Sequence, residues 1–173
     1  QIFAALPESR QTALFSATLA PFIRRMINRF LDHPVWIQMG EEIEPASTIR
    51  QLYYEVALQD KFVGLKEVLR TELRDEKALV FCRTQIQVDR LADRLRRDGF
   101  DAEPIHGGLR QSQRDAVMKG FRSGRLRILI ATNVAARGLD IPEISHVINY
   151  DMPGNVEEYV HRIGRTGRIG NEG

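Results

Sequence analysis

The sequence has one cysteine and no apolar run that approaches the length of a membrane span, although 43% of its 173 residues are hydrophobic. Because Cys82 is alone, an internal disulfide is excluded, and no cluster of Cys and His has the spacing of metal ligands. A signal peptide is lacking too, so we expect a cytoplasmic protein without a membrane partner. Cys82 lies in an apolar run, Ala78 to Cys82, which predicts a buried, inert thiol.

A large net charge is also lacking, and the formal value of +2 alone says little about partners. The charges are unevenly distributed, however. From Arg83 to Arg127 there are eleven Lys or Arg against six Asp or Glu, whereas Glu41, Glu42 and Glu44 form an acidic stretch. This asymmetry favours a central region that faces phosphate, although a solvated helix face would account for part of it.

The most concentrated positive charge lies between Tyr159 and Arg168, where the sequence is YVHRIGRTGR. Its arginines recur at every third residue, and the glycines between them let the backbone bend and approach a ligand closely. Arginine presents a planar fork of donors that matches phosphate oxygens two at a time. A polyphosphate is therefore the expected ligand, and a solvated basic loop is the alternative.

Strand-like and helix-like segments alternate from residue 49 onward. Apolar runs predict strands at 51–57, 78–82, 102–106, 126–132 and 146–150. Helical periodicity predicts helices between them, and two candidate capping boxes, Thr84 with Gln87 and Asn155 with Glu158, mark helix starts. The strict alternation predicts an α/β fold in which a parallel sheet carries helices on both faces.

Residues 1–39 have the character of the end of a domain rather than its start. They predict two strands, 12–15 and 35–39, around a helix that begins at Pro21, a set too small to cover both faces of a sheet. We therefore expect poor packing there. Residues 40–48 mix Gly, Pro, Ser and acidic residues, which is typical of a linker. Residues 49–173 form a second domain that we expect to be truncated at its end.

Polar residues follow several of the predicted strands at the point where each strand ends. They are Thr84, His106 with Gly107, Thr132 and Asp151. Taken singly, each is more often a cap, a turn residue or a satisfied core group. Because ligands of open α/β sheets bind outside the carboxyl ends of the strands, their coincidence predicts a functional edge.

Six segments resemble, in this order, the motifs of the DEAD-box ATP-dependent RNA helicases of helicase superfamily two. They are SAT (16–18), VFCRT (80–84), IHGGLRQSQR (105–114), ATNVAARGLDIP (131–142), VINYDMP (147–153) and HRIGRTGR (161–168). The resemblance implies two RecA-like domains of P-loop NTPase-type architecture that close around RNA and ATP. This chain would hold the end of the first domain, the linker and most of the second, the helicase C-terminal domain.

The resemblance also assigns roles, none of them to a metal. Arg165 and Arg168 would be catalytic arginine fingers that reach the γ-phosphate of ATP, and Gly138 and Asp140 would bind the nucleotide beside them. The RNA backbone would be met by Thr84, Gly107, Arg114 and Thr132. Coupling between the domains would fall to Ser16, Thr18, Arg137, Asp151, His161 and Arg162.

The activity implied by the resemblance is RNA-dependent ATP hydrolysis coupled to local unwinding of RNA duplexes and remodelling of ribonucleoproteins. Its partners would be single-stranded and duplex RNA, ribonucleoprotein components and the N-terminal RecA-like domain of the same chain. No GxxxxGKS or GxxxxGKT loop and no DEAD tetrapeptide occurs in the sequence. The main loop for ATP with Mg²⁺ would therefore lie in an upstream domain, and this chain alone is expected to be inactive. A non-catalytic RNA-binding module and a related DNA helicase are the alternatives.

Overall fold

The structure, a computed structural model, describes residues 6–7, 9–16, 21–37, 48–73, 76–136, 144–167 and 172–173. The chain divides into two compact units, Gln1–Ile43 and Glu44–Gly173. Within the described residues, the larger unit holds every strand and all the helices but one. No helix in these ranges has the length and apolar character that a membrane crossing requires.

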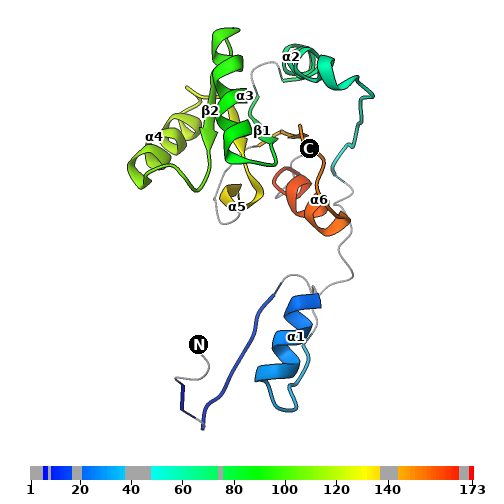
Figure 1. Cartoon of the computed structure of the whole chain (residues 1–173), viewed down its shortest axis with the longest axis vertical. Coiled ribbons are helices and arrows are strands. Elements are labelled where there is room, and N and C mark those ends of the chain that lie inside the picture. Colours follow the sequence, from blue (N-terminus) through cyan, green and yellow to red (C-terminus); the bar gives the residue numbers. More distant parts are fainter. Residues whose placement is uncertain are drawn as a thin grey trace. The chain divides into compact units, whose positions relative to one another are not determined.

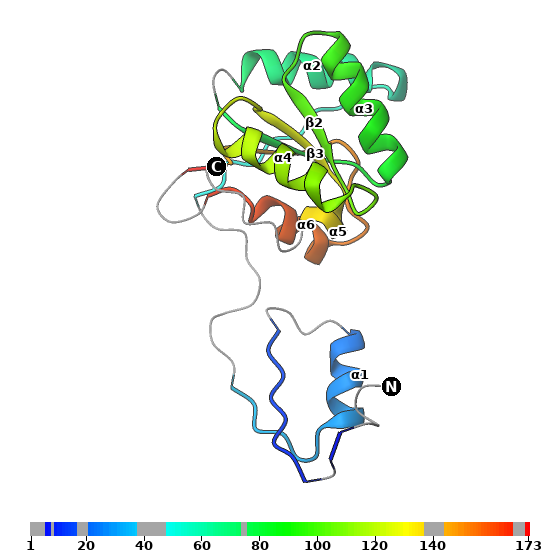
Figure 2. The same ribbon diagram turned by 90° about the vertical axis from the view of Figure 1, so that its left-hand side faces the viewer.

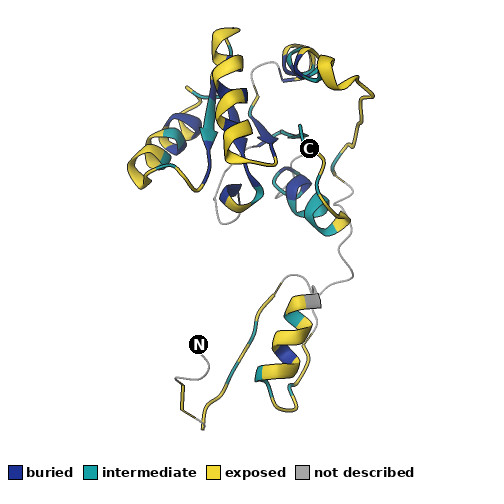
Figure 3. Ribbon diagram, in the orientation of Figure 1, coloured by how far each residue is buried: buried dark blue, intermediate teal, exposed yellow. Residues whose placement is uncertain are grey.

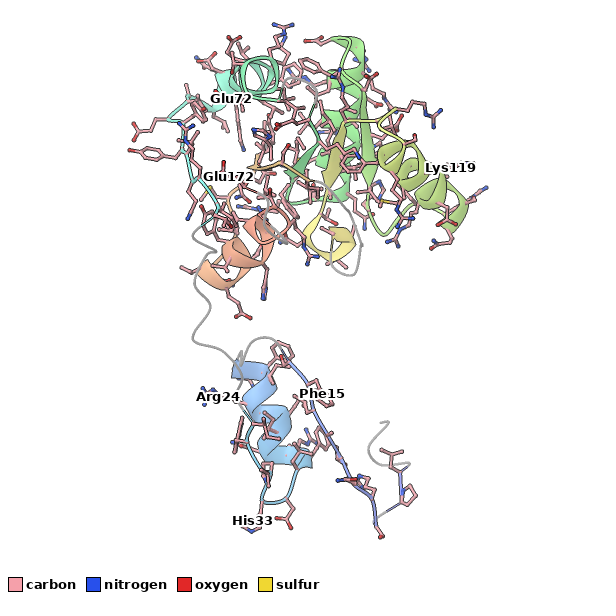
Figure 4. All side chains as sticks on the ribbon, turned by 180° about the vertical axis from the view of Figure 1, so that it is seen from behind. Phe15, Arg24, His33, Glu72, Lys119 and Glu172 are labelled. Atoms are coloured by element: carbon pink, nitrogen blue, oxygen red, sulfur yellow. The ribbon has the colours of Figure 1, made fainter. Side chains whose placement is uncertain are left out.

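The smaller unit contains one described helix, α1 (Pro21–Phe30), which begins where the sequence predicts (Figure 1). Among its described residues only Ile27 is buried, whereas Phe15, Val35 and Ile37 are at least 84% exposed. Figure 3 shows the exposed surface of α1, and Figure 4 labels Phe15 on the extended segment before the helix. The expected poor packing of this segment is confirmed.

The larger unit is built on a four-stranded sheet in the order β2-β3-β1-β4. Every strand pair is parallel. The strands are β1 (Ala78–Phe81), β2 (Ala102–Ile105), β3 (Ile128–Ala131) and β4 (His146–Asn149). Each coincides with a strand that the sequence predicts. Three begin at the predicted residue and end one residue earlier, and β3 is shorter at both ends, so the parallel α/β fold is confirmed.

The helices of this unit follow the strands in alternation (Figure 2). They are α2 (Lys61–Thr71), α3 (Gln85–Arg97), α4 (Gln111–Arg122), α5 (Asn133–Ala136) and α6 (Val156–Ile163), with a short 3-10 helix, η2 (Leu58–Asp60), before α2. Two predicted signals fix the ends of α3. Thr84 and Gln87 form the capping box, and Gly99 ends the helix at a φ of 85°.

Two apolar cores lie on opposite faces of the sheet because successive side chains of a strand point to opposite sides. Val80 belongs to the core that α2 and α3 cover, together with Leu65 and Leu91. Its neighbour Leu79 belongs to the other core, which α4 covers with Phe121. Figure 3 shows β1 buried, in dark blue, and β2 partly intermediate, in teal. Helices therefore cover both faces, as the sequence predicts.

Three predicted strands are wrong. Residues 12–15, 35–37 and 51–57 form no strand, and residues 38–39 lie outside the described residues. A strand is defined by backbone pairing, which an apolar pattern cannot supply. Near the third segment, ladder-type bonds occur only where Gly173 N donates to Thr48 O (3.0 Å) and Arg50 N donates to Gly173 O (2.6 Å), among the described residues.

The single cysteine lies directly after β1 and is 1% exposed. Burial, and then the negative charge of Asp151, raise the pKa of the Cys82 thiol to about 12. The thiol therefore stays protonated at physiological pH, and a protonated thiol is neither nucleophile nor metal ligand. The predicted burial of Cys82 is confirmed.

We expect Leu129→Ala to lower the free energy of unfolding by about 2–5 kcal/mol, because it empties a fully buried position between the central strands and their helices. Ile86→Ala is the control, since Ile86 is 64% exposed. It should cost less than about 0.5 kcal/mol. Urea denaturation of the two variants measures the difference, and equal losses would contradict this description of the core.

Candidate functional site

The carboxyl ends of all four strands meet at one edge of the sheet, because every strand pair is parallel. Across this edge the residues that follow the strands are, in order, His106 with Gly107 after β2, Thr132 after β3, Thr84 after β1 and Asp151 after β4. The parallel topology thus brings the predicted polar residues to a common edge. This edge is the candidate site.

Arg162 is the buried cation of this edge and is only 4% exposed. Its guanidinium carbon lies 4.9 Å from the centre of the Phe81 ring at the end of β1. The guanidinium donates hydrogen bonds of 2.6–2.8 Å to Asn133 Oδ1, Asn149 Oδ1, the Asp151 carbonyl oxygen and Glu158 Oε1. These contacts tie the ends of three strands to α6. They all lie within this unit, so a role of Arg162 in coupling to another domain stays a prediction.

Glu158 supplies the countercharge to Arg162. It also accepts hydrogen bonds from Asn133 Nδ2 and, at 3.2 Å, from Gly154 N. Burial alone would raise the pKa of Glu158, but these hydrogen bonds and the charge of Arg162 outweigh it and lower the pKa. The expected capping box is half correct. Asn155 Oδ1 accepts from Glu158 N (2.8 Å), but the Glu158 carboxylate reaches the Gly154 amide rather than that of Asn155.

Asp151 joins the loop after β1 to α2. Its carboxylate accepts a hydrogen bond from Lys61 Nζ (2.7 Å) and another from Arg83 N (2.9 Å), next to Thr84. Burial would raise the pKa of Asp151, but the hydrogen bond from Lys61, the bond from the Arg83 amide and the two positive charges lower it overall. The Asp151 carbonyl oxygen also accepts a hydrogen bond from Arg162 of α6. Asp151 therefore connects α6 with the loop after β1, in which Thr84 lies.

The chain turns sharply after α6, and two residues fix that turn. Thr166 Oγ1 lies 2.6 Å from the Ile144 carbonyl oxygen and 2.9 Å from that of Ser145. Gly167 has a φ of 65°, and a Cβ there would stand 2.7 Å from Ile49 Cγ1. The close backbone approach expected at this glycine is therefore to Ile49 of the same unit. Thr166 lies inside the motif HRIGRTGR but is not among the predicted site residues, because nothing in the motif marks its hydroxyl as a support of this turn.

A small cavity of about 20 Å³ lies at this edge. It has room for about one water molecule. Its lining residues are Phe81, Asn133, Ala136, Glu158, His161, Arg162 and Arg165. His161 and Arg165, both predicted site residues, are thus brought together with Arg162 at the end of α6.

The four predicted RNA contacts differ in exposure. Gly107 and Thr84 are exposed and Arg114 is half-buried, whereas Thr132 is only 8% exposed. Thr84 already uses its hydroxyl in the cap of α3, where it accepts from Gln87 N (3.2 Å). Ser16 is exposed in the smaller unit. The remaining predicted site residues, Thr18, Arg137, Gly138, Asp140 and Arg168, lie outside the described residues.

Comparison with known families assigns this architecture. Residues 60–170 match the family model of the helicase conserved C-terminal domain. The chain is 45% identical over 172 residues to the DEAD-box ATP-dependent RNA helicase CshA of Geobacillus kaustophilus and 44% identical to that of Bacillus subtilis. The matches cover 99% of this chain but only 37% and 35% of those proteins.

Solved structures give the same result. Dbp5 of S. cerevisiae, bound to RNA and ADP BeF3, matches 99% of this chain and 46% of its own with a TM-score of 0.85 and 34% identity. The E. coli DEAD-box protein SrmB, bound to regulator of ribonuclease activity A, matches 68% of each chain with a TM-score of 0.63 and 40% identity.

The sheet, the edge and these matches define a RecA-like helicase domain. The chain belongs to the DEAD-box family of RNA helicases and contains the helicase C-terminal domain of that family. It spans about a third of the length of the curated relatives it matches.

We expect the stability of this unit to fall with pH in the range where Asp151 becomes protonated. Since its folded pKa is lowered, its contribution is fully present above the unfolded value of about 3.9 and is lost as the pH falls through the folded value. Asp151→Asn should therefore lower the free energy of unfolding by about 1–3 kcal/mol at neutral pH, and it should make the stability less dependent on pH in the acid range. Thermal unfolding between about pH 7 and pH 2 measures both.

The control is Asp93→Asn, because the Asp93 side chain is 51% exposed and pairs with Arg96 on the surface of α3. It should leave the unfolding midpoint nearly unchanged at neutral pH. An acid dependence that is identical in Asp151→Asn and the parent chain would contradict the role given to Asp151.

Proposed function

We propose that this chain is one part of an ATP-dependent RNA helicase, in which RNA-stimulated ATP hydrolysis drives the local opening of RNA duplexes and the remodelling of ribonucleoproteins. The observation that carries the proposal is the shared edge of the sheet. Exposed Thr84 and Gly107 follow the ends of β1 and β2, and Arg165 follows α6 and lines the cavity at this edge together with Phe81 at the end of β1. One edge can therefore offer contacts to an RNA backbone and to a triphosphate.

Recognition of RNA by this edge would be independent of sequence. Thr84 presents the N-terminal end of α3, and Gly107 presents a backbone amide, which are both donors suited to phosphate. Arg114, on α4, would add a positive charge to the same strand of RNA. The Dbp5 structure contains bound RNA, and that protein shares the fold over nearly the whole of this chain.

Binding of ATP with Mg²⁺ would be shared with a second domain. The cavity beside Arg165 and His161 admits about one water molecule. In this proposal the unit would therefore offer one wall of a nucleotide site, and the second domain would offer the other. The donors on that wall are cationic and suit phosphate oxygens. Arg165 and Arg168 would stabilise the charge that develops on the γ-phosphate, with Gly138 and Asp140 beside the nucleotide.

The same proposal covers the division of the chain. Residues 1–39 would be the end of the first RecA-like domain, residues 40–48 the linker, and residues 49–173 most of the second RecA-like domain. The exposed Phe15, Val35 and Ile37 support this, because such side chains are normally buried by the rest of a domain. Ser16, Thr18, Arg137, Asp151 and His161 would meet across the closed domains, and the cytoplasmic location stays a prediction.

The decisive measurement is ATP turnover with and without single-stranded RNA. It compares this chain with the same chain joined to an upstream domain that carries a phosphate loop. We expect turnover only in the joined, RNA-supplied sample. RNA binding without turnover in either would favour a non-catalytic binding module, and better competition by DNA than by RNA would favour a DNA helicase.

Within the joined protein, Arg165→Ala and Arg168→Ala should each lower the RNA-stimulated turnover by about 10³-fold or more, since arginine fingers contribute on the order of 10³ to 10⁵ in rate. RNA binding without nucleotide should change little. The matched control is Arg125→Ala, because Arg125 is exposed and precedes β3, at the opposite end of the strands. Equal loss of turnover and RNA binding would refute the assignment of the fingers.

Arg114→Ala should weaken RNA binding to a similar degree for all sequences and reduce the dependence of log affinity on log salt by about one unit. Lys119→Ala is the control on the same helix, since Lys119 projects from α4 into solvent (Figure 4). Fluorescence anisotropy with labelled oligonucleotides measures both variants. A loss that depends on the base sequence would contradict recognition through the backbone.

A further inference from the structure

His106 is a buried histidine that the proposed function leaves without a role. It follows β2 at the candidate edge and is 6% exposed. Both ring nitrogens have partners. Nε2 lies 2.9 Å from Asp89 Oδ1 on α3, and Nδ1 lies 3.1 Å from the backbone nitrogen of Gly108.

These partners fix where the proton of the ring resides. A backbone N–H can only donate, so His106 Nδ1 accepts the hydrogen bond from Gly108 and carries no proton. Nε2 then carries the proton and donates it to the Asp89 carboxylate. The ring is therefore held at both ends, by α3 on one side and by the backbone of the following turn on the other.

The turn that His106 holds contains Gly107, the proposed phosphate contact. Leu109 N donates to the His106 carbonyl oxygen at 3.2 Å and closes the turn. Among the described residues no acceptor takes the Gly107 amide, and Gly107 is exposed. The following amide, that of Gly108, donates to the His106 ring. The exposed Gly107 amide can therefore donate to a ligand.

Gly108 fits this arrangement because it has no side chain. A Cβ at Gly108 would stand 2.8 Å from Gln85 Oε1 and 3.1 Å from His106 Nδ1. Gln85 is the first residue of α3 and directly follows Thr84. Gln85 and Asp89 lie one turn apart on α3, so the same helix that Thr84 caps also supports the turn of Gly107.

We propose that His106 is a positioning residue of the RNA site. It holds the turn 106–108 so that the Gly107 amide faces the same RNA backbone that Thr84 contacts. This inference rests on the proposed function, since it names what orients one of the RNA contacts. The bond that matters is the one from the Gly108 amide to Nδ1. The bond to Asp89 anchors the ring.

Two substitutions separate these bonds. His106→Asn places an amide oxygen near the position of Nδ1 and keeps an acceptor for Gly108, but it is too short to reach Asp89. His106→Gln places a donor near the position of Nε2 and keeps the contact with Asp89, but it leaves Gly108 without an acceptor. Each variant removes one of two hydrogen bonds, so a general loss of packing affects both alike.

The experiment measures binding of a labelled single-stranded oligouridylate to this chain at low salt, together with hydrogen exchange of the Gly108 amide. His106→Asn should bind within about twofold of the parent chain and retain Gly108 protection. His106→Gln should bind about three- to tenfold more weakly, the cost of one lost hydrogen bond, and lose that protection. Asp89→Asn is the matched control and should behave as the parent, because its amide oxygen still accepts from Nε2.

A second variant covers the case in which a His106 variant fails to fold. Gly108→Ala keeps His106 but pushes the turn away from its ring, and it should weaken RNA binding to the same extent as His106→Gln. If the parent chain binds RNA and His106→Gln or Gly108→Ala binds as tightly, the inference is wrong and the proposed function stands. If the parent chain alone binds no RNA, the same variants are measured in the joined protein; absence of RNA binding there as well makes the proposed function wrong, and the inference falls with it.

Discussion

The burial of one positive charge, that of Arg162, holds the functional edge together. Removing a guanidinium from water is costly unless its donors are satisfied, and here four hydrogen bonds and the Phe81 ring surround it. Its partners come from the ends of β3 and β4 and from α6. Since no apolar side chain could bind those polar groups, the cation is what holds α6 against the ends of these strands. The position of Arg165 depends on that.

Asp151 extends this arrangement to the other side of the edge. Its carbonyl binds Arg162 while its carboxylate binds Lys61 and the Arg83 amide. A shift of α6 therefore acts on the loop that presents Thr84, through one residue and without a change in the sheet. Lys61 of α2, the Arg83 amide and Arg162 of α6 are thus linked through Asp151 inside this unit. The connection is local, because each link is a direct hydrogen bond.

The fold could be predicted where local signals decide it, as at the capping box of Thr84 and the apolar run of β1. It could not be predicted where pairing decides it. Residues 51–57 have a strand-like pattern, but among the described residues no ladder forms along them. The site shows the same limit. The motif identified Arg162 as a site residue. The spacing of its arginines does not reveal, however, that the guanidinium of Arg162 donates its hydrogen bonds to residues of the same unit. The motif contains Thr166 but does not mark its hydrogen bonds, and nothing in the sequence marks the pairing of Asp89 with His106, because both roles arise only from tertiary contact.

The chemistry of Cys82 has a practical consequence for following the motions of this protein. The sequence has no other thiol, and this one is buried and held protonated by a pKa of about 12. Maleimides and spin-label reagents are electrophiles that the thiolate attacks, so they should not label the buried, protonated Cys82. Two introduced cysteines, one at an exposed position in each unit, would then be the only targets of the dyes. Distances between the two units could be followed by energy transfer without first removing the natural thiol.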